Sequence, residues 1–149
     1  MGYPKPVLEI PPVTGNDVDE IESGIERRAR EFFGTVDLAF PDRYHAKLTD
    51  DRFSDSKRYV VEGVRVQLYW SDRPERVTRS VDLPPVFGGS LTEIEAEIKR
   101  LTAEFFGTTT GVSSPRADYA VVVETDAKGD KKYKAKDVTV THTDDWPRA

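Results

Sequence analysis

The sequence of 149 residues contains no cysteine and only two histidines. Without cysteine the chain cannot form disulfide bonds, zinc–thiolate sites or iron–sulfur clusters, and it cannot use a thiol as a nucleophile. Because small secreted domains usually depend on disulfides, we expect a cytoplasmic protein or a component of an intracellularly assembled particle. His45 and His142 have no spaced partner of the kind that a metal site needs. The sequence therefore predicts no metal, no cofactor and no catalytic residue.

Long apolar runs and a surplus of basic residues are also missing. No stretch approaches the roughly 18 apolar residues of a membrane span, and we expect no secretory signal because the first residues lack a basic start and an apolar core. The net charge is −5, from 22 basic and 27 acidic side chains. We therefore expect a soluble protein that does not enter a membrane and for which nucleic acid is not the expected partner.

Motifs for nucleotide binding and serine hydrolysis are absent as well. The chain has no G-x-G-x-x-G, no G-K-[ST] and no G-x-S-x-G. The adjacent carboxylates Asp50–Asp51 and Asp144–Asp145 point to different sides of the chain and are typical of solvated loops. These observations predict a protein that is not an enzyme.

One segment of the sequence occurs twice. Residues 7–35 and 80–108 align without a gap and share 14 identities in 29 positions, where chance gives about two. Each copy begins with a short apolar strand that stops at a Pro-Pro pair. A glycine turn, a capping box and an amphipathic helix follow, and the helix ends at Gly34 or Gly107. The shared positions are those that a fold needs.

Strand patterns surround the two helices. Apolar residues alternate with polar ones over 64–70, a returning strand covers 77–83, valines fill 119–125, and Val138 and Val140 mark a last strand. The order β-α-β-β-α-β-β predicts an α+β fold, namely a ferredoxin-like split βαβ sandwich with one antiparallel sheet and both helices on one face. The expected strand order is 4-1-3-2, with the fifth strand beside the fourth.

We expect residues 1–149 to form a single domain of two fused repeats, about 7–79 and 80–149, because strand 77–83 leaves no linker between them. Two separate β-α-β-β units in tandem are the alternative. The copies differ most between the helix and the next predicted strand, where the first has 23 residues (36–58) and the second has 10 (109–118). This insertion at 36–58 is either a functional loop or a short extra strand that covers one end of the core.

The candidate interaction residues lie mainly in the insertion. They are Arg43, Tyr44, His45, Arg52 and Phe53 in the insertion, Tyr69 on the second predicted strand and Trp146 near the C-terminus. Trp146 is either packed back on the core or an anchor for a partner, because tryptophan is enriched at interfaces.

The leading hypothesis is a non-catalytic protein-interaction or assembly subunit, such as a virion component or an accessory protein. It would bind a protein partner or a second copy through an open edge at strand 137–142. One alternative is an RNA-binding module that uses the open sheet face, with Tyr69, Trp70, Arg65, Arg76 and Arg79 as its support. Another is a small ligand-binding domain or enzyme built on His45 and the insertion.

Overall fold

The protein has an α+β fold with two helices and mixed sheets in the part of the chain that is described. A computed structural model describes residues 6–34, 39–50, 57–68, 76–107, 115–125 and 127–146. The elements follow in the order β1 (Val7–Glu9), β2 (Val13–Gly15), α1 (Val18–Phe33), β3 (Ala39–Pro41), β4 (Arg43–Leu48), β5 (Tyr59–Val61), β6 (Arg65–Leu68), β7 (Arg76–Asp82), β8 (Val86–Gly88), α2 (Leu91–Phe106), β9 (Arg116–Thr125) and β10 (Lys131–Asp145). The α+β class predicted from the sequence is confirmed.

Both helices begin and end where the repeated segment predicts. The side chains of Asp17 and Ser90 cap the helices by accepting a hydrogen bond from the backbone N–H three residues ahead, at 2.9 and 3.3 Å. Gly34 and Gly107 end them with φ angles of 77° and 75°, a region that favours glycine. Each helix buries one apolar stripe against the sheet and leaves its charged face in solvent.

Each half of the chain pairs its strands around a central one. In the first half the consecutive strands β5 and β6 are central, with β2 and β1 antiparallel on one side and β4 and β3 on the other. In the second half β10 is central, with β8 and β7 on one side and β9 on the other. The described part of the segment 36–58 thus contributes the strands β3 and β4, which take the place in the first half that β9 takes in the second.

The central strands are interrupted at corresponding places. Gly63 separates β5 from β6 with a φ of 68°, and Asp137 has a φ of 55° within β10. The N–H groups of Ile10 and Leu83 donate to the carbonyl of the residue after each interruption, at 3.1 and 2.9 Å. A residue with positive φ turns the strand locally, so that one central strand can pair with two short strands in succession.

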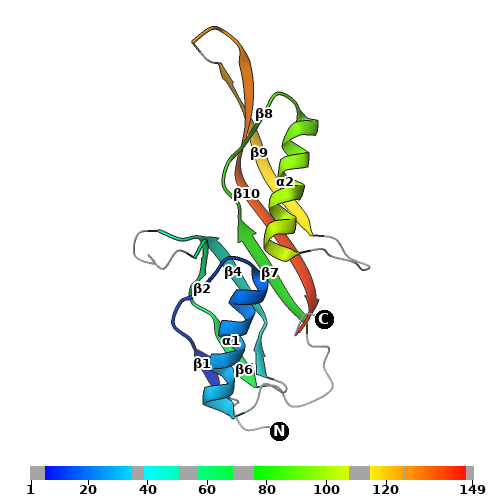
Figure 1. The fold of residues 1–149 in the computed structure, drawn as a ribbon. Coiled ribbons are helices and arrows are strands. Elements are labelled where there is room, and N and C mark those ends of the chain that lie inside the picture. The colour runs from blue at the N-terminus through cyan, green and yellow to red at the C-terminus, as the bar shows by residue number, and fades with distance from the viewer. Residues whose placement is uncertain are drawn as a thin grey trace.

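The two halves meet in a parallel strand pair. Arg43 to Ala46 of β4 lie beside Thr78 to Val81 of β7, and the N–H of Thr78 donates to the carbonyl of Asp42 at 3.0 Å. The inward-facing residues of β4 and β7 fall on the same side, so both helices cover one face of the joined sheet. Figure 1 shows the halves end to end, with the β9–β10 hairpin projecting beyond β8.

This strand order differs from the ferredoxin-like order that the sequence predicts. Strand β1 pairs with β6 in a separate three-stranded sheet, whereas the prediction places it beside the strand at 77–83. The physical reason is that β4, in a segment expected to be a loop or a single extra strand, lies between β5 of the first half and β7. The strand at 137–142 is also not an open edge, because Thr139 of β10 lies between Asp82 of β7 and Asp118 of β9.

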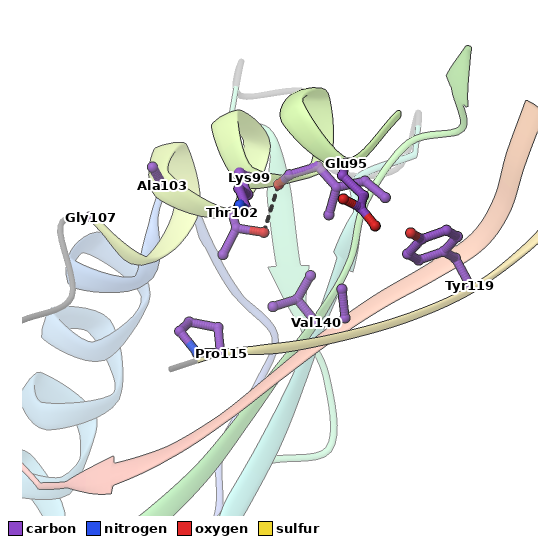
Figure 2. Close-up of a pocket in the computed structure, with 10 residues that line it drawn as sticks. Glu95, Lys99, Thr102, Ala103, Gly107, Pro115, Tyr119 and Val140 are labelled. Carbon is purple, nitrogen blue, oxygen red and sulfur yellow. Dashed lines mark hydrogen bonds between the residues drawn. The ribbon is translucent and has the colours of Figure 1, made fainter. Parts of the chain in front are cut away.

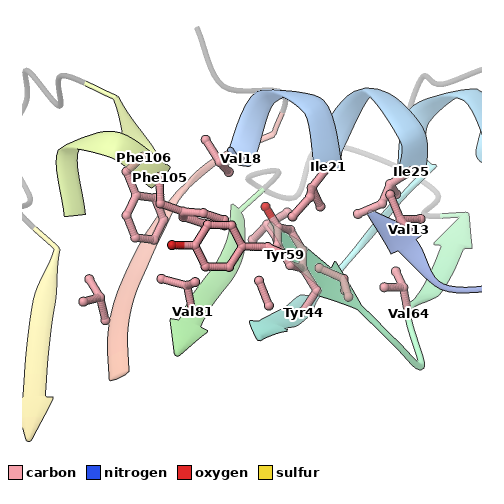
Figure 3. Packing of buried hydrophobic residues seen from close by; sticks show 14 of the residues in the cluster. Val13, Val18, Ile21, Ile25, Tyr44, Tyr59, Val64, Val81, Phe105 and Phe106 are labelled. Atoms are coloured by element: carbon pink, nitrogen blue, oxygen red, sulfur yellow. The ribbon is translucent and has the colours of Figure 1, made fainter. Parts of the chain in front are cut away.

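The hydrophobic core runs through both halves as one cluster. Figure 3 shows Phe105 and Phe106 at the end of α2 reaching the region of Tyr59, below Val18 and Ile21 of α1. The rings of Tyr59 and Phe105 meet edge to face with their centroids 5.0 Å apart, a geometry that adds to the effect of burial. The last turn of α2 therefore anchors the second half to the first.

Candidate interaction site

The residues that the sequence singles out lie in different environments. On β4, Tyr44 faces the core, whereas Arg43 and His45 lie on the exposed face. Trp146 is buried and packs back on the core, its ring centroid 5.8 Å from the guanidinium carbon of Arg79. The remaining candidates, Arg52, Phe53 and Tyr69, lie outside the described residues.

His45 bridges β4 and β7 on the exposed face of the sheet. Its Nδ1 atom lies 2.7 Å from the Oγ of Ser80, and its Nε2 atom lies 2.9 Å from a carboxylate oxygen of Asp82. These are the groups of a serine-hydrolase triad, but acyl transfer also needs a cleft and N–H donors for the developing oxyanion. The side chains of His45 and Asp82 are nearly half exposed on an open strand surface. We interpret the contact as a link across the parallel pair.

A charged network buried at the junction of the halves was missed by the sequence analysis. Arg79, expected on a solvated sheet face, is 0% exposed and lies on the core face. Its Nε and Nη2 donate to the carboxylate of Glu22 on α1, the Nη2 contact to Oε1 measuring 3.1 Å. The hydroxyl of Tyr44 donates to the same carboxylate. Nη1 of Arg79 donates to the carbonyls of Val77 and Asp144, both at 3.3 Å.

Burial and charge set the protonation of this network. Burial raises the pKa of the Tyr44 phenol well above its usual value of 10, and the charge of Glu22 raises it further. Burial alone would lower the pKa of the Arg79 guanidinium, but hydrogen bonds to Glu22 and the charge of Glu22 outweigh this and raise it. The network therefore holds one paired ion couple and one neutral phenol. It ties α1 and β4 of the first half to β7 and the end of β10.

We expect stability to fall at alkaline pH because of Tyr44. In the unfolded chain the phenol loses its proton near pH 10, whereas folded Tyr44 keeps it. Above about pH 10 the unfolded state thus binds fewer protons, and the free energy of unfolding falls by about 1.4 kcal/mol per pH unit for this group. Denaturant unfolding at a series of pH values measures the slope. Tyr44→Phe should reduce the slope by one proton, and an unchanged slope would contradict the assignment.

The second half has a groove at the corresponding place. It has a volume of about 540 Å³ and lies between α2 and β9, with Glu95, Ile98, Lys99, Thr102, Ala103, Gly107, Pro115, Ala117, Tyr119 and Val140 around it. Figure 2 shows the carboxylate of Glu95 and the hydroxyl of Tyr119 facing one another across this groove.

Glu95 and Tyr119 occupy the positions that Glu22 and Tyr44 have in the first half. Glu95 follows Glu22 by the repeat offset of 73. Val121 and Ala46, two residues after the tyrosines, pair with Ala135 and Val61. Each of these partners lies two residues before the interruption of its central strand. Glu95 is exposed and Tyr119 is half-buried. Among the residues that the structure describes, neither side chain makes a hydrogen bond or an ion pair.

The edge of the sheet beside this groove has no second strand among the described residues. Strand β4 is covered by β7, but β9 pairs with β10 alone in the described ranges. The effect is visible in the side chains, since Ala46 of β4 is 0% exposed and Val121, its counterpart on β9, is 43% exposed. We define the open edge of β9 together with the groove under α2 as the β9 site.

The sequence contains signals for the buried Glu22–Arg79 network and for the β9 site. The parity of β7 places Arg79 on the same face as Val77 and Val81, which marks it as inward-facing. The repeat alignment places Glu22 and Glu95 at one position, a shared polar residue on a helix.

Comparisons with known proteins assign the chain to no family. No family model, no curated protein and no solved structure matches the chain. Across the described ranges there is no group of three or more histidine, aspartate or glutamate side chains that could hold a metal ion. In those same ranges neither helix has the length and apolar character needed to span a membrane. The site must therefore be interpreted from its own geometry.

Proposed function

We propose that the protein is a non-catalytic assembly subunit that binds a strand of a protein partner at the β9 site. In this proposal the chain consists of two β-α-β-β units that arose by duplication of one unit. One observation carries it: the first unit has β7 on the edge of β4, whereas no described strand pairs with the same edge of β9 in the second unit. Open edges of this kind bind added strands through backbone hydrogen bonds.

The β9 edge offers the hydrogen-bonding groups that the covered β4 edge uses. In the first unit the N–H of Thr49 donates toward β5, to the carbonyl of Arg58 at 2.9 Å. Because strand N–H groups alternate in direction, those of Tyr44 and Ala46 point toward β7. The counterparts on β9 are Tyr119 and Val121, whose N–H and C=O groups face the open edge.

The side chains of the β9 site indicate the chemistry of the partner strand. Tyr119, Val121 and Val123 present apolar surface, the last two more than two-fifths exposed. Glu95 adds a negative charge at the position where Glu22 binds Arg79 in the first unit. The site therefore fits a parallel strand with apolar residues at alternate positions and a basic or neutral residue opposite Glu95. In this proposal the subunit works in the cytoplasm or in a particle assembled there.

The alternative functions have less support. The RNA-binding hypothesis uses Arg79, and this side chain is buried in an ion pair. Of the other residues that support it, Tyr69 and Trp70 lie outside the described ranges, and Arg65 and Arg76 lie at the starts of different strands. The enzyme hypothesis uses His45, whose bonded groups lie on an open sheet surface.

A peptide that copies β7 tests the proposed function. We expect a peptide with the sequence of residues 76–83, RVTRSVDL, to bind the protein and to shift the amide NMR signals of Tyr119, Val121 and Val123. Replacing the fourth residue of the peptide by glutamate should weaken binding by more than about tenfold, because it faces Glu95. The protein variant Glu95→Arg should reverse this preference. If the peptide shifts no β9 signal at any attainable concentration, the β9 site does not accept a strand and the proposed function is wrong.

A further inference from the structure

We propose that the partner strand at the β9 site is β1 of a second copy of this chain, so that molecules join end to end in one direction. This inference rests on the proposed function and names its partner. The contact between β4 and β7 inside the chain serves as the template, because β1 is the counterpart of β7 in the repeat. In the described ranges β1 pairs with β6 alone, so its outer edge is open at the other end of the molecule.

Among the described residues, the outer edge of β1 keeps one of the hydrogen-bond donors that the template uses, the N–H of Val7 at the position of Ser80. Thr78 donates its N–H to β4, so by alternation Ser80 also faces β4, whereas the N–H of Arg79 faces β10. The repeat offset places Pro6 at the position of Arg79 and Val7 at that of Ser80. Proline lacks an N–H, but here it stands where the N–H would point away from the partner. The amide of Val7 stays available at the open edge.

Glu95 has a different charged neighbour from Glu22. Pro6 supplies no cation in place of Arg79. On α2, however, Lys99 lies four residues after Glu95 and lines the same groove, a spacing at which opposite charges on a helix attract. The first unit has Glu26 at the corresponding position. The second unit therefore carries its own cation and can accept a neutral strand such as β1.

The two ends of the molecule also carry counterparts of a second contact between the units. Phe105 of α2 is 0% exposed and meets Tyr59 of the first unit. Its counterpart Phe32 is 56% exposed on α1. Tyr133 of β10, the counterpart of Tyr59 beside the break in the central strand, is half-buried. In the end-to-end contact Phe32 of one molecule would meet Tyr133 of the next.

The template fixes the register of the contact. Tyr44, His45 and Ala46 lie opposite Arg79, Ser80 and Val81. Transferred to the open edges, this places Tyr119, Ala120 and Val121 of one molecule opposite Pro6, Val7 and Leu8 of the next. The contact joins two different surfaces, β1 of one molecule and β9 of another. A dimer therefore still presents one β1 edge and one β9 edge, and further molecules can add to form a chain.

Single-cysteine variants test the contact, because the natural sequence has no cysteine. Val7 and Ala120 are exposed, and their templates Ser80 and His45 touch through their side chains. We mix Val7→Cys with isotope-labelled Ala120→Cys under mild oxidation and identify the disulfide dimers by mass. The expected product is the mixed dimer, in several-fold excess over either homodimer. Val7→Cys mixed with Ala96→Cys, an exposed position on α2 outside the contact, gives the level of random collision.

The outcomes separate this inference from the proposed function. Adding Phe32→Ala to the Val7→Cys variant should reduce the yield of mixed dimer several-fold, because it removes the contact to Tyr133. A predominant Ala120→Cys homodimer would mean that β9 pairs with β9, which overturns the end-to-end contact and retains strand binding. A mixed dimer at the collision level, in a protein that binds the β7 peptide, would show that the partner is another protein. Failure of the peptide itself would overturn both.

Discussion

Glu22→Ala is expected to lower the free energy of unfolding by about 3–5 kcal/mol, the usual cost of removing one partner of a buried ion pair. The variant would leave the guanidinium of Arg79 buried without its carboxylate and would take from Tyr44 the acceptor of its hydroxyl. Typical domains have only about 5–15 kcal/mol of stability in total. The expected loss is therefore a large share of the free energy of unfolding. The lost ion pair lies at the junction of the two halves.

Chemical denaturation followed by circular dichroism measures this loss, and the repeat supplies the control. Glu95→Ala changes the same helix position in the second half, where the side chain is exposed, and should change stability by less than about 0.5 kcal/mol. The double variant Glu22→Ala with Arg79→Met should recover part of the loss, because it removes both charges. Equal effects of Glu22→Ala and Glu95→Ala would show that the network does not hold the halves together.

Phe105→Ala is expected to cost about 3–5 kcal/mol as well, for a different reason. The ring is fully buried and contacts Tyr59 and Phe106 edge to face, so its removal loses apolar burial and leaves a cavity. The counterpart Phe32 makes a similar edge-to-face contact with Phe33, with centroids 4.8 Å apart, but is mostly exposed. Phe32→Ala should therefore cost less than about 1 kcal/mol.

The pair of phenylalanine variants is a matched comparison, since both residues precede a second phenylalanine at the end of a helix in the same repeated segment. Their unfolding midpoints in urea give the difference directly, and the slopes should stay nearly equal because one side chain is a small part of the surface exposed on unfolding. A large loss for Phe32→Ala measured at low protein concentration would contradict its exposure. A small loss for Phe105→Ala would contradict the anchoring of α2 on the first half.

The helices could be predicted from the sequence because their signals are local. Caps, apolar spacing and terminal glycines act within one segment, and all are found at the predicted residues. The strands at 39–48 could not be recognised as easily, since Pro41 and three basic residues interrupt the apolar pattern. On β4, Tyr44 and Ala46 do alternate with those basic residues, which is a usable but short signal.

The pairing of strands and the candidate site depend on contacts that the sequence does not specify. The parallel contact of β4 with β7 joins residues about 35 positions apart, and no local rule selects it over the antiparallel order that the sequence predicts. The alternation along β7 indicates that Arg79 faces inward, but arginine is rarely buried without a partner, and its partner Glu22 lies 57 positions away. Arg52, Phe53 and Tyr69 lie outside the described residues, so their roles stay predictions.

Strand β7 belongs to both halves, since it pairs with β10 in its own half and with β4 in the other. A linear array of two units is stabilised by the units themselves and by the interface between them. Here the interface includes a strand pair, the Glu22–Arg79 ion couple and the Phe105–Tyr59 contact. Unfolding of one half would remove a paired strand from the sheet of the other half. Unfolding of the two repeats is therefore coupled, and the cooperative unit is larger than the repeat.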